Sequence, residues 1–399
     1  MAGRTNAGLN ATTVTYLNVV GGDTANATQA VEMQMLPDSG IIYDLRVTLT
    51  ATSDNGGGAD TYTFVVMSET STTSLTCPIV DSTTCTDLVH VAAVTAGSRL
   101  SVRSTPANTP ASVSARFTFK FISDTKGNTV LMGGGENATV DTVNTTYQAL
   151  HVVRAGGTTE FVEELLIPTA GTVKSLYVMT SVAPDIGVGV QEYVFTVRKN
   201  ETGTALTTTI SETETADSDT SNSFTVAAGD SISLEIDPSV IAPTAAAVWA
   251  GVVFAPDIDG EFILSGSSAD TLNGAATEYG RVTTAGNTYS ATETDQQQST
   301  SAMIVKAIYA ETSADSNNGA ADEGYTFTLR ATAAATAATC PIPEGATLTC
   351  NLTGLAVVLT NAQAIDTAVT PSANDPLSTI TANVSYLGYI APSSDIMEY

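Results

Sequence analysis

Apolar and polar side chains alternate with a period of two over much of the chain. In the run YVFTVR, Tyr193, Phe195 and Val197 are spaced so that all three lie on one face of an extended segment. The segment 231–236, SISLEI, alternates in the same way. Alternation of this kind is typical of a β-strand with one buried face. The pattern therefore predicts strands as the main element of the fold.

Polar, turn-forming clusters separate the alternating segments. Gly, Asp, Asn and Ser are concentrated at 53–60 and 314–324, where they favour turns. Stretches with a helical period are scarce, and the best candidate is the short run 160–168, EFVEELLIP. Many short strands joined by polar turns are typical of a β-sandwich. The predicted fold class is thus all-β, built from antiparallel β-sandwiches.

The pattern recurs three times along the chain. The triplet Tyr-x-Phe begins at 62, 193 and 325, at spacings of 131 and 132 residues. Flanking segments match in the same order, for example VKSLYVMTS at 173–181 with VKAIYAETS at 305–313. We expect the aromatic residues of the triplets to be core positions of the repeats: Tyr62, Phe64, Tyr193, Phe195, Tyr325 and Phe327.

Each repeat spans about 130 residues, enough to bury a hydrophobic core of its own. Turn-rich polar segments lie near 123–127 and 255–260 and separate the repeats. We therefore expect three tandem domains of this size: 1–124, 125–257 and 258–399.

The start of the first repeat differs from the other two. The second and third repeats open on the apolar strands NTVLMGGG and EFILSGS, which we match to VTYLNVVGG at 14–22. Residues 1–13 are polar and unlike the other repeat starts. We therefore expect them to form an N-terminal extension of the first domain.

The best-matching motifs carry a resemblance to a known group of proteins. The run Y-x-F-T-[VL]-R at 193–198 and the run V-x-A-G-D-x-I-S-L at 226–234 resemble the tandem jelly-roll repeats of phage and uncultivated-virus virion surface proteins. Those repeats are related in shape to the globular heads of the tumour-necrosis-factor type. The resemblance covers nearly the whole chain. It implies jelly-roll domains, a trimeric or pseudo-trimeric arrangement and display on a virion surface, without implying a ligand or catalytic residues.

The charge balance excludes several classes of partner. The chain has 14 Lys and Arg against 41 Asp and Glu, a net charge of −27. Nucleic-acid phosphates and anionic lipids are bound by clustered basic residues, so neither is an expected partner. The longest apolar run, 245–255, is too short to span a membrane, so we expect no membrane insertion. The start of the chain has no apolar secretory segment, which leaves cytoplasmic assembly or another export route open.

The four cysteines form two pairs at one repeat position. In the first and third repeats, the first cysteine follows the repeat tyrosine by 15 residues, whereas the second repeat has Thr208 there and no cysteine at all. This joint presence and absence predicts two local disulfides across hairpins, with free thiols as the alternative. A zinc site is disfavoured because the pairs lie in separate domains with spacings longer than C-x₂₋₄-C. Disulfides imply a working life outside a reducing cytoplasm. The predicted disulfide residues are Cys77, Cys85, Cys340 and Cys350.

Residues with catalytic or metal-binding chemistry are few. His90 and His151 lie in alternating strand contexts at non-equivalent repeat positions, with no nucleophile motif nearby, so structural roles are expected. Acidic loops at 54–60, 217–219 and 315–323 contain carboxylates, which are calcium ligands, but none has the EF-hand spacing. Solvated loops are the favoured interpretation and calcium binding the alternative. We predict no catalytic residue, no metal site and no cofactor.

Aromatic residues near the last strand of a repeat also allow two interpretations. Trp249, Tyr386 and Tyr389 alternate with apolar neighbours. This context favours packing in the core or between repeats over a carbohydrate-binding surface.

These observations predict a non-enzymatic structural protein: a virion surface component, such as a decoration, spike or fibre subunit, that assembles through sandwich faces and edges. Expected partners are further copies, other virion proteins or a host-surface receptor, and the expected location is the virion surface or the extracellular space. The alternative is an extracellular filament subunit that polymerises by strand addition from residues 1–13. A polysaccharide-cleaving enzyme is a third hypothesis and would need carboxylates that converge in a groove.

Overall fold

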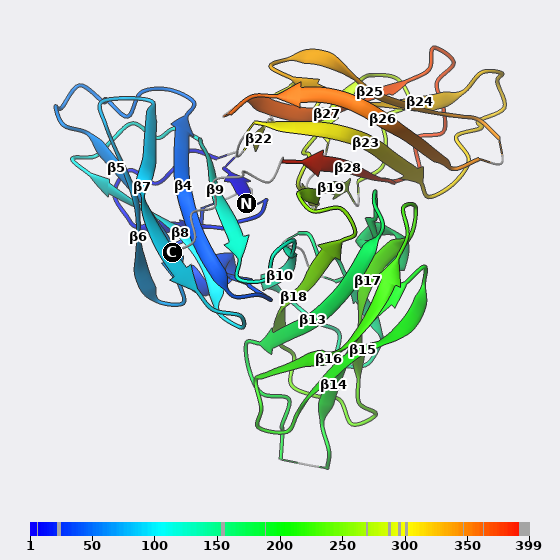
Figure 1. Ribbon diagram of the computed structural model, residues 1–399, viewed down its shortest axis with the longest axis horizontal. Coiled ribbons are helices and arrows are strands. Elements are labelled where there is room, and N and C mark those ends of the chain that lie inside the picture. The colour runs from blue at the N-terminus through cyan, green and yellow to red at the C-terminus, as the bar shows by residue number, and fades with distance from the viewer. Residues whose placement is uncertain are drawn as a thin grey trace.

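The computed structural model describes residues 1–5, 7–21, 25–152, 156–187, 189–268, 270–285, 289–293, 297–299, 302–345, 347–361 and 363–390. The predicted third domain extends to residue 399, so its last nine positions lie outside the described residues. Within the described ranges the chain forms six sheets, which pack in pairs into three lobes (Figure 1).

The first lobe is a sandwich of two sheets. Its strand orders are β1-β9-β4-β7 and β2-β8-β5-β6, with β3 added to β8. Without the two-residue β3, these orders are 1-8-3-6 facing 2-7-4-5, the jelly-roll arrangement of two Greek keys. The elements are β1 (Ala2–Arg4), β2 (Thr15–Leu17), the 3₁₀ helix η1 (Gln29–Glu32), β3 (Gln34–Met35), β4 (Gly40–Leu49), β5 (Thr61–Ser68), β6 (Ser71–Val80), β7 (Thr84–Val94), β8 (Arg99–Ala107) and β9 (Ala115–Ser123).

The second lobe repeats this topology. The sheet β10-β18-β13-β16 faces the sheet β11-β17-β14-β15, and β12 is added to β17. The elements are β10 (Thr129–Thr139), β11 (Thr146–Gln148), η2 (Glu160–Glu163), β12 (Leu165–Leu166), β13 (Gly171–Thr180), β14 (Glu192–Lys199), β15 (Thr202–Ser211), β16 (Ala216–Val226), β17 (Ser231–Pro238) and β18 (Ala247–Pro256).

The third lobe has the same order with one strand, β21, added outside β19: β21-β19-β28-β23-β26 faces β20-β27-β24-β25, and β22 is added to β27. All strand pairs named here are antiparallel except β19 with β21. The prediction of three tandem antiparallel jelly rolls is therefore confirmed. The elements are β19 (Glu261–Ser268), β20 (Glu278–Gly280), β21 (Thr284–Ala285), β22 (Gln297–Gln298), β23 (Met303–Thr312), β24 (Gly324–Ala331), β25 (Ala334–Pro343), β26 (Thr349–Leu359), β27 (Ala364–Pro371) and β28 (Ala382–Tyr389).

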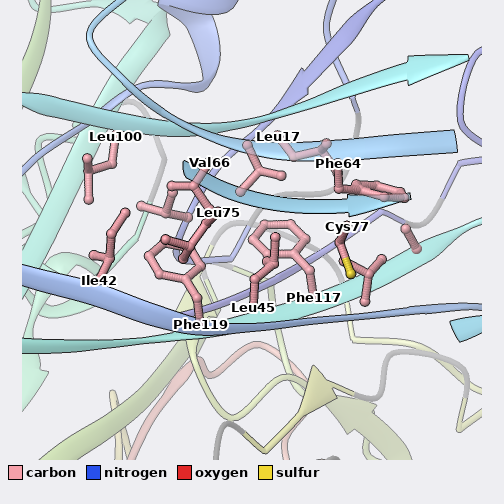
Figure 2. Packing of buried hydrophobic residues seen from close by; sticks show 14 of the residues in the cluster. Leu17, Ile42, Leu45, Phe64, Val66, Leu75, Cys77, Leu100, Phe117 and Phe119 are labelled. Atoms are coloured by element: carbon pink, nitrogen blue, oxygen red, sulfur yellow. The ribbon is translucent and has the colours of Figure 1, made fainter. Parts of the chain in front are cut away.

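Each jelly roll has its own apolar core between its two sheets. In the first, Phe117 and Phe119 of β9 point toward Phe64 of β5 and Leu75 of β6 from the opposite sheet (Figure 2). Burial of a side chain of this size stabilises the fold by about 1.5–3 kcal/mol. The six repeat aromatics lie at matching places on β5, β14 and β24 and are all buried: Tyr62, Phe64, Tyr193, Phe195, Tyr325 and Phe327.

The repeat tyrosines have one further role in common. The hydroxyl of Tyr193 donates a hydrogen bond to the carbonyl oxygen of Thr244 at 2.9 Å, and that of Tyr325 donates to Leu377 at 3.0 Å. The hydroxyl of Tyr62 donates to Ala111 at 3.1 Å. Each acceptor lies in the loop that leads to the last strand of the jelly roll. The tyrosine thus ties this loop to the core, which satisfies a buried hydroxyl.

The expected start of the first repeat is wrong. Residues 2–4 form β1, which pairs with β9 as β10 pairs with β18. The segment 14–22 contains β2 instead, the counterpart of β11 and β20. Residues 1–13 are therefore part of the first jelly roll, and Leu9 is fully buried in its core. A three-residue strand is too short to show an alternating pattern, so the sequence did not reveal it.

The helical candidate at 160–168 is only partly helical. Its first residues form the single turn η2, and Leu165 and Leu166 continue as β12 against β17. One turn of helix has no stability of its own because nucleation is unfavourable. Burial of the two leucines in a strand therefore decides the conformation.

Candidate functional site: the interfaces between the jelly rolls

The three jelly rolls contact one another head to tail. The sheet that holds the first strand of one jelly roll packs on the segment that precedes β4, β13 or β23 in another. β10 and β18 contact η1 and β3, β19 and β28 contact η2 and β12, and β1 and β9 contact β22. The same two surfaces are used each time, and the third contact joins the last jelly roll to the first. Repeated heterologous contacts that close in this way form a ring with a pseudo-threefold axis. The three jelly rolls therefore form a compact body and not an extended row (Figure 1).

The interface between the first and second jelly rolls is tightly packed. The guanidinium of Arg99 lies 4.9 Å from the ring centroid of Trp249, which is 2% exposed. A Cβ on Gly251 would lie 2.6 Å from the carbonyl oxygen of Met35, so the two backbones approach closely there. Met132 of β10 belongs to the core cluster of the first jelly roll. This interface is therefore continuous with an apolar core.

The interface between the second and third jelly rolls is also apolar at its centre. Leu166, at the position equivalent to Met35, forms a buried cluster with Tyr309 and Leu387. The side-chain amide of Asn383 donates a hydrogen bond to the carbonyl oxygen of Phe161 at 2.7 Å. The interface thus combines apolar burial with a directional contact.

The interface that closes the ring, between the third and first jelly rolls, is polar. Gln298 occupies the position of Met35 and Leu166, on the strand that contacts β1 and β9. Arg116 on β9 is at the position of Trp249, and burial lowers its pKa while the charge of Asp366 raises it. The closing contact therefore has polar side chains at the positions where the other two interfaces have apolar ones.

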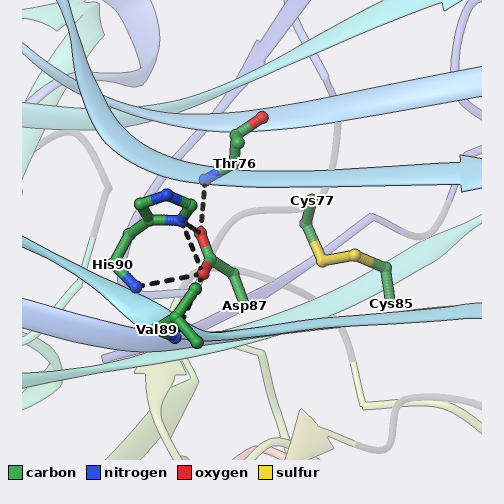
Figure 3. Close-up of a disulfide and its surroundings, with 6 residues drawn as sticks. All are labelled: Thr76, Cys77, Cys85, Asp87, Val89 and His90. Atoms are coloured by element: carbon green, nitrogen blue, oxygen red, sulfur yellow. Dashed lines mark hydrogen bonds and ion pairs between the residues drawn. A yellow bond between two sulfur atoms is a disulfide. The ribbon is translucent and has the colours of Figure 1, made fainter.

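Both predicted disulfides are present in the structure. Cys77 bonds Cys85 with 5.6 Å between the Cα atoms (Figure 3), and Cys340 bonds Cys350 with 5.7 Å. The prediction that each crosses a hairpin needs correction, because β6 and β7 belong to opposite sheets, as do β25 and β26. Each disulfide therefore ties the two sheets of a sandwich together at its open edge. On the chain-entropy model, a short loop of this kind contributes about 2–3 kcal/mol.

His90 forms a structural contact beside the first disulfide. Its Nδ1 lies 2.9 Å from Oδ1 of Asp87, whose Oδ2 accepts the backbone N–H of Thr76 at 2.9 Å (Figure 3). Burial raises the pKa of Asp87, but these hydrogen bonds outweigh it and lower the pKa. In the second jelly roll Asn222 makes the same contact to Asp219, from its side-chain amide at 2.9 Å. A neutral amide thus makes the same contact as the imidazole. The contact between His90 and Asp87 is therefore a structural contact within the edge strand β7.

The other residues singled out from the sequence are mostly buried. His151 is buried, and Tyr386 is fully buried in the core of the third jelly roll. Trp249 belongs to an interface, as described above. Tyr389 is half-buried, with the ammonium of Lys306 4.4 Å from its ring centroid. None of these four presents a broad exposed ring for a sugar.

Three buried carboxyl groups have strongly raised pKa values, one in each jelly roll. Burial raises the pKa of Glu32 to about 8, against a hydrogen bond from the backbone of Asn18. Burial likewise raises the pKa of Glu164 and of Glu278 to about 7. Each accepts a local hydrogen bond, for Glu164 from the hydroxyl of Ser231 at 2.8 Å. The three groups thus belong to separate domains and local hydrogen-bond networks.

No family model matches the chain, and the comparison with curated proteins found no match. No helix among the described residues is long and apolar enough to cross a membrane. The two disulfides fit a protein that works outside a reducing cytoplasm, in an extracellular setting.

The residues at the centres of the three interfaces were not predicted from the sequence. Met35, Leu166 and Gln298 lie in segments of two residues, where no periodicity can be recognised. Met35 and Leu166 each lie three residues after the end of η1 or η2, and Gln298 shares their position by its strand pairing. Only the pairing of distant strands reveals this shared position.

Proposed function

We propose that the protein is a non-enzymatic structural component of a virion surface, such as a decoration, spike or fibre subunit. The observation that carries this proposal is the closed ring of three jelly rolls made by one chain. A ring of three separate chains would depend on protomer concentration, whereas covalent linkage makes its formation intramolecular. A preassembled three-lobed body suits a component that is added to a particle as one unit.

The surface charge favours a discrete particle. At −27 per chain, copies repel one another and remain soluble at low salt. All three interfaces between the jelly rolls are already occupied inside the ring. Binding to a further partner would therefore use surfaces on the outside.

The strand β7 offers such a surface. It lies at the edge of its sheet, and Leu88, Val89 and Val91 on it are 60, 83 and 60% exposed. The equivalent positions of the second jelly roll are the polar residues Thr220, Ser221 and Ser223. Apolar exposure at a strand edge favours association with another protein. We place the attachment to a second virion protein at this edge of the first jelly roll.

The alternative function, an extracellular filament subunit, stays a prediction. Strand addition would cost contacts that the structure already makes. Strand addition from residues 1–13 would require β1 to leave β9 and Leu9 to leave the core of its own jelly roll. Domain-swapped assembly of this kind exchanges contacts that already exist in the single chain.

The proposal is tested by the shape of the purified protein and by its presence on the surface of virions. Electron microscopy and light scattering of the purified chain are expected to show a three-lobed monomer of 40.9 kDa over a range of salt concentrations. Antibodies raised against the chain are then expected to label the surface of virions from the sample in which the sequence occurs. Long filaments, or unlabelled virions, would overturn the proposal.

A matched pair of variants tests the attachment edge. Val89→Ser introduces the residue found in the second jelly roll and is expected to weaken binding to virions at least tenfold. Val240→Ser changes a fully exposed valine of the second jelly roll and is expected to leave binding unchanged. Equal binding by both variants would remove β7 as the attachment surface.

A further inference from the structure

Three carboxylates meet at one end of the first jelly roll. Asp54 and Asp60 lie in the loop between β4 and β5, and Asp81 follows β6. One carboxylate oxygen from each lies within 4.8 Å of the other two. Two oxygens that bind one Ca²⁺ at 2.3–2.6 Å are at most about 5 Å apart. The spacing of these oxygens therefore fits a shared cation.

Asp60 has a buried oxygen that the protein leaves without a partner. Its side chain is fully buried, and its Oδ2 accepts the backbone N–H of Asn55 at 2.7 Å. Its Oδ1 is buried and has no hydrogen-bond partner. This Oδ1 faces the loop, because it lies 3.6 Å from the place that a Cβ on Gly57 would take. A buried carboxylate oxygen without a partner is costly, and a cation in the loop would satisfy it.

The negative charge of the cluster is not neutralised by side chains. Asp81 accepts the backbone N–H groups of Asp60 at 2.8 Å and of Ala59 at 2.9 Å, and Asp54 accepts that of Gly56 at 2.7 Å. Among the described residues, no lysine, arginine or histidine forms an ion pair with the three aspartates. Backbone donors orient the carboxylates without removing their mutual repulsion.

The second jelly roll keeps the loop but replaces the buried carboxylate. Gln191 is at the position of Asp60, and its Oε1 accepts the backbone N–H of Ile186 at 2.7 Å, as Asp60 does from Asn55. The Nε2 of Gln191, also buried without a partner, is a donor and cannot bind a cation. The closing hydrogen bond of the loop therefore does not require a carboxylate.

The third jelly roll replaces a different member of the cluster. Asn317 is at the position of Asp54 and accepts the backbone N–H of Gly319 at 2.8 Å, as Asp54 does from Gly56. Glu323 and Glu344 are at the positions of Asp60 and Asp81, and each has one buried oxygen without a partner. Among the described residues, three carboxylates come together in the first jelly roll alone. The third charge is thus an addition that the loop geometry does not need.

We propose that the first jelly roll binds one Ca²⁺ through Asp54, Asp60 and Asp81. Asp54 and Asp81 are exposed, so water completes the six to eight oxygens that Ca²⁺ takes. Sites with few protein ligands at an extracellular surface bind Ca²⁺ with a Kd of about 10⁻⁴–10⁻³ M. The cation links the β4–β5 loop to Asp81 at the end of β6, the strand that carries Cys77.

The experiment is a calcium titration of the full chain after treatment with a chelator. Calorimetry is expected to show one Ca²⁺ per chain, and a tenfold excess over Kd is expected to raise the melting midpoint by roughly 4 °C. Mg²⁺ at the same concentration is expected to raise it less, since it demands octahedral geometry. No calcium-dependent rise, or an equal rise with Mg²⁺, would overturn the assignment.

Two variants separate calcium binding from folding. Asp60→Asn keeps an oxygen for the N–H of Asn55 and is expected to lower the calcium affinity at least tenfold. In chelator it is expected to melt at or above the wild-type midpoint, because one of the repelling charges is gone. Asp185→Asn, at the position of Asp54 in the second jelly roll, is the control and is expected to keep the full response. A full response from Asp60→Asn, or binding of three ions per chain, would refute the site.

Discussion

The hydroxyl of Thr208 donates a hydrogen bond to the carboxylate of Asp217 in the second jelly roll. These two residues are at the positions of the disulfide partners: Asp217 pairs with Val178 as Cys85 pairs with Val47, and Thr208 pairs with Phe195 as Cys77 pairs with Phe64. One jelly roll thus joins its two sheets with a hydrogen bond at the place where the other two use a covalent bond.

A third disulfide can therefore be introduced. The double variant Thr208→Cys/Asp217→Cys is expected to oxidise spontaneously, because the equivalent pairs have Cα separations of 5.6 and 5.7 Å. Oxidation is expected to raise the free energy of unfolding by about 2–3 kcal/mol over the reduced variant. Mass spectrometry for the bond, and urea unfolding with and without reductant, check this. The single variant Thr208→Cys is the control, and free thiols in the oxidised double variant would contradict the equivalence.

The contact at Gly251 is expected to decide how the first two jelly rolls pack. In Gly251→Ala the added Cβ would lie 2.6 Å from the carbonyl oxygen of Met35. Overpacking of this kind costs about 1–3 kcal/mol. Unfolding measurements and an increased radius in X-ray scattering would show the effect. Gly203→Ala, where the nearest atom is 3.5 Å away on Thr196, is the control and is expected to leave both unchanged.

Stability is expected to fall as the pH rises, because of Glu32. Burial raises its pKa to about 8 in the folded protein, above the ordinary value of 4.5. Between these values the folded state holds a proton that the unfolded state releases, so the free energy of unfolding decreases by up to about 1.4 kcal/mol per pH unit from this group. In Glu32→Gln this part of the slope is expected to disappear. Urea unfolding at pH 5, 6, 7 and 8 measures both slopes, and equal slopes would argue against a buried, protonated Glu32.

The contact between His90 and Asp87 is expected to tolerate loss of the imidazole but not loss of the carboxylate. His90→Asn copies the Asn222–Asp219 contact and is expected to change stability by less than about 0.5 kcal/mol. Asp87→Ala leaves the backbone N–H of Thr76 without its acceptor and is expected to cost about 1–3 kcal/mol. Chemical unfolding compares the two. A large loss in His90→Asn would show that the imidazole itself has a role.

The sequence determined the local structure and the number of units. The alternation around Tyr193 and Phe195 required a strand with one buried face, since the side-chain period of a strand is two. The repeat spacing predicted three similar folds, and the matched cysteines favoured two local disulfides over free thiols. Each of these rests on neighbours in the chain or on a period long enough to recognise.

The tertiary structure alone decided the rest. β1 and β3 are too short to carry a pattern, so only pairing with β9 and β8 shows that they are strands. Closure of the ring depends on Met35, Leu166 and Gln298, which lie far from their contacts in sequence and are recognised only by shared position. The aspartates of the proposed calcium site come from two loops that the sandwich brings together. Contacts between distant segments are set by how the faces pack, and residue order does not encode that packing in any short pattern.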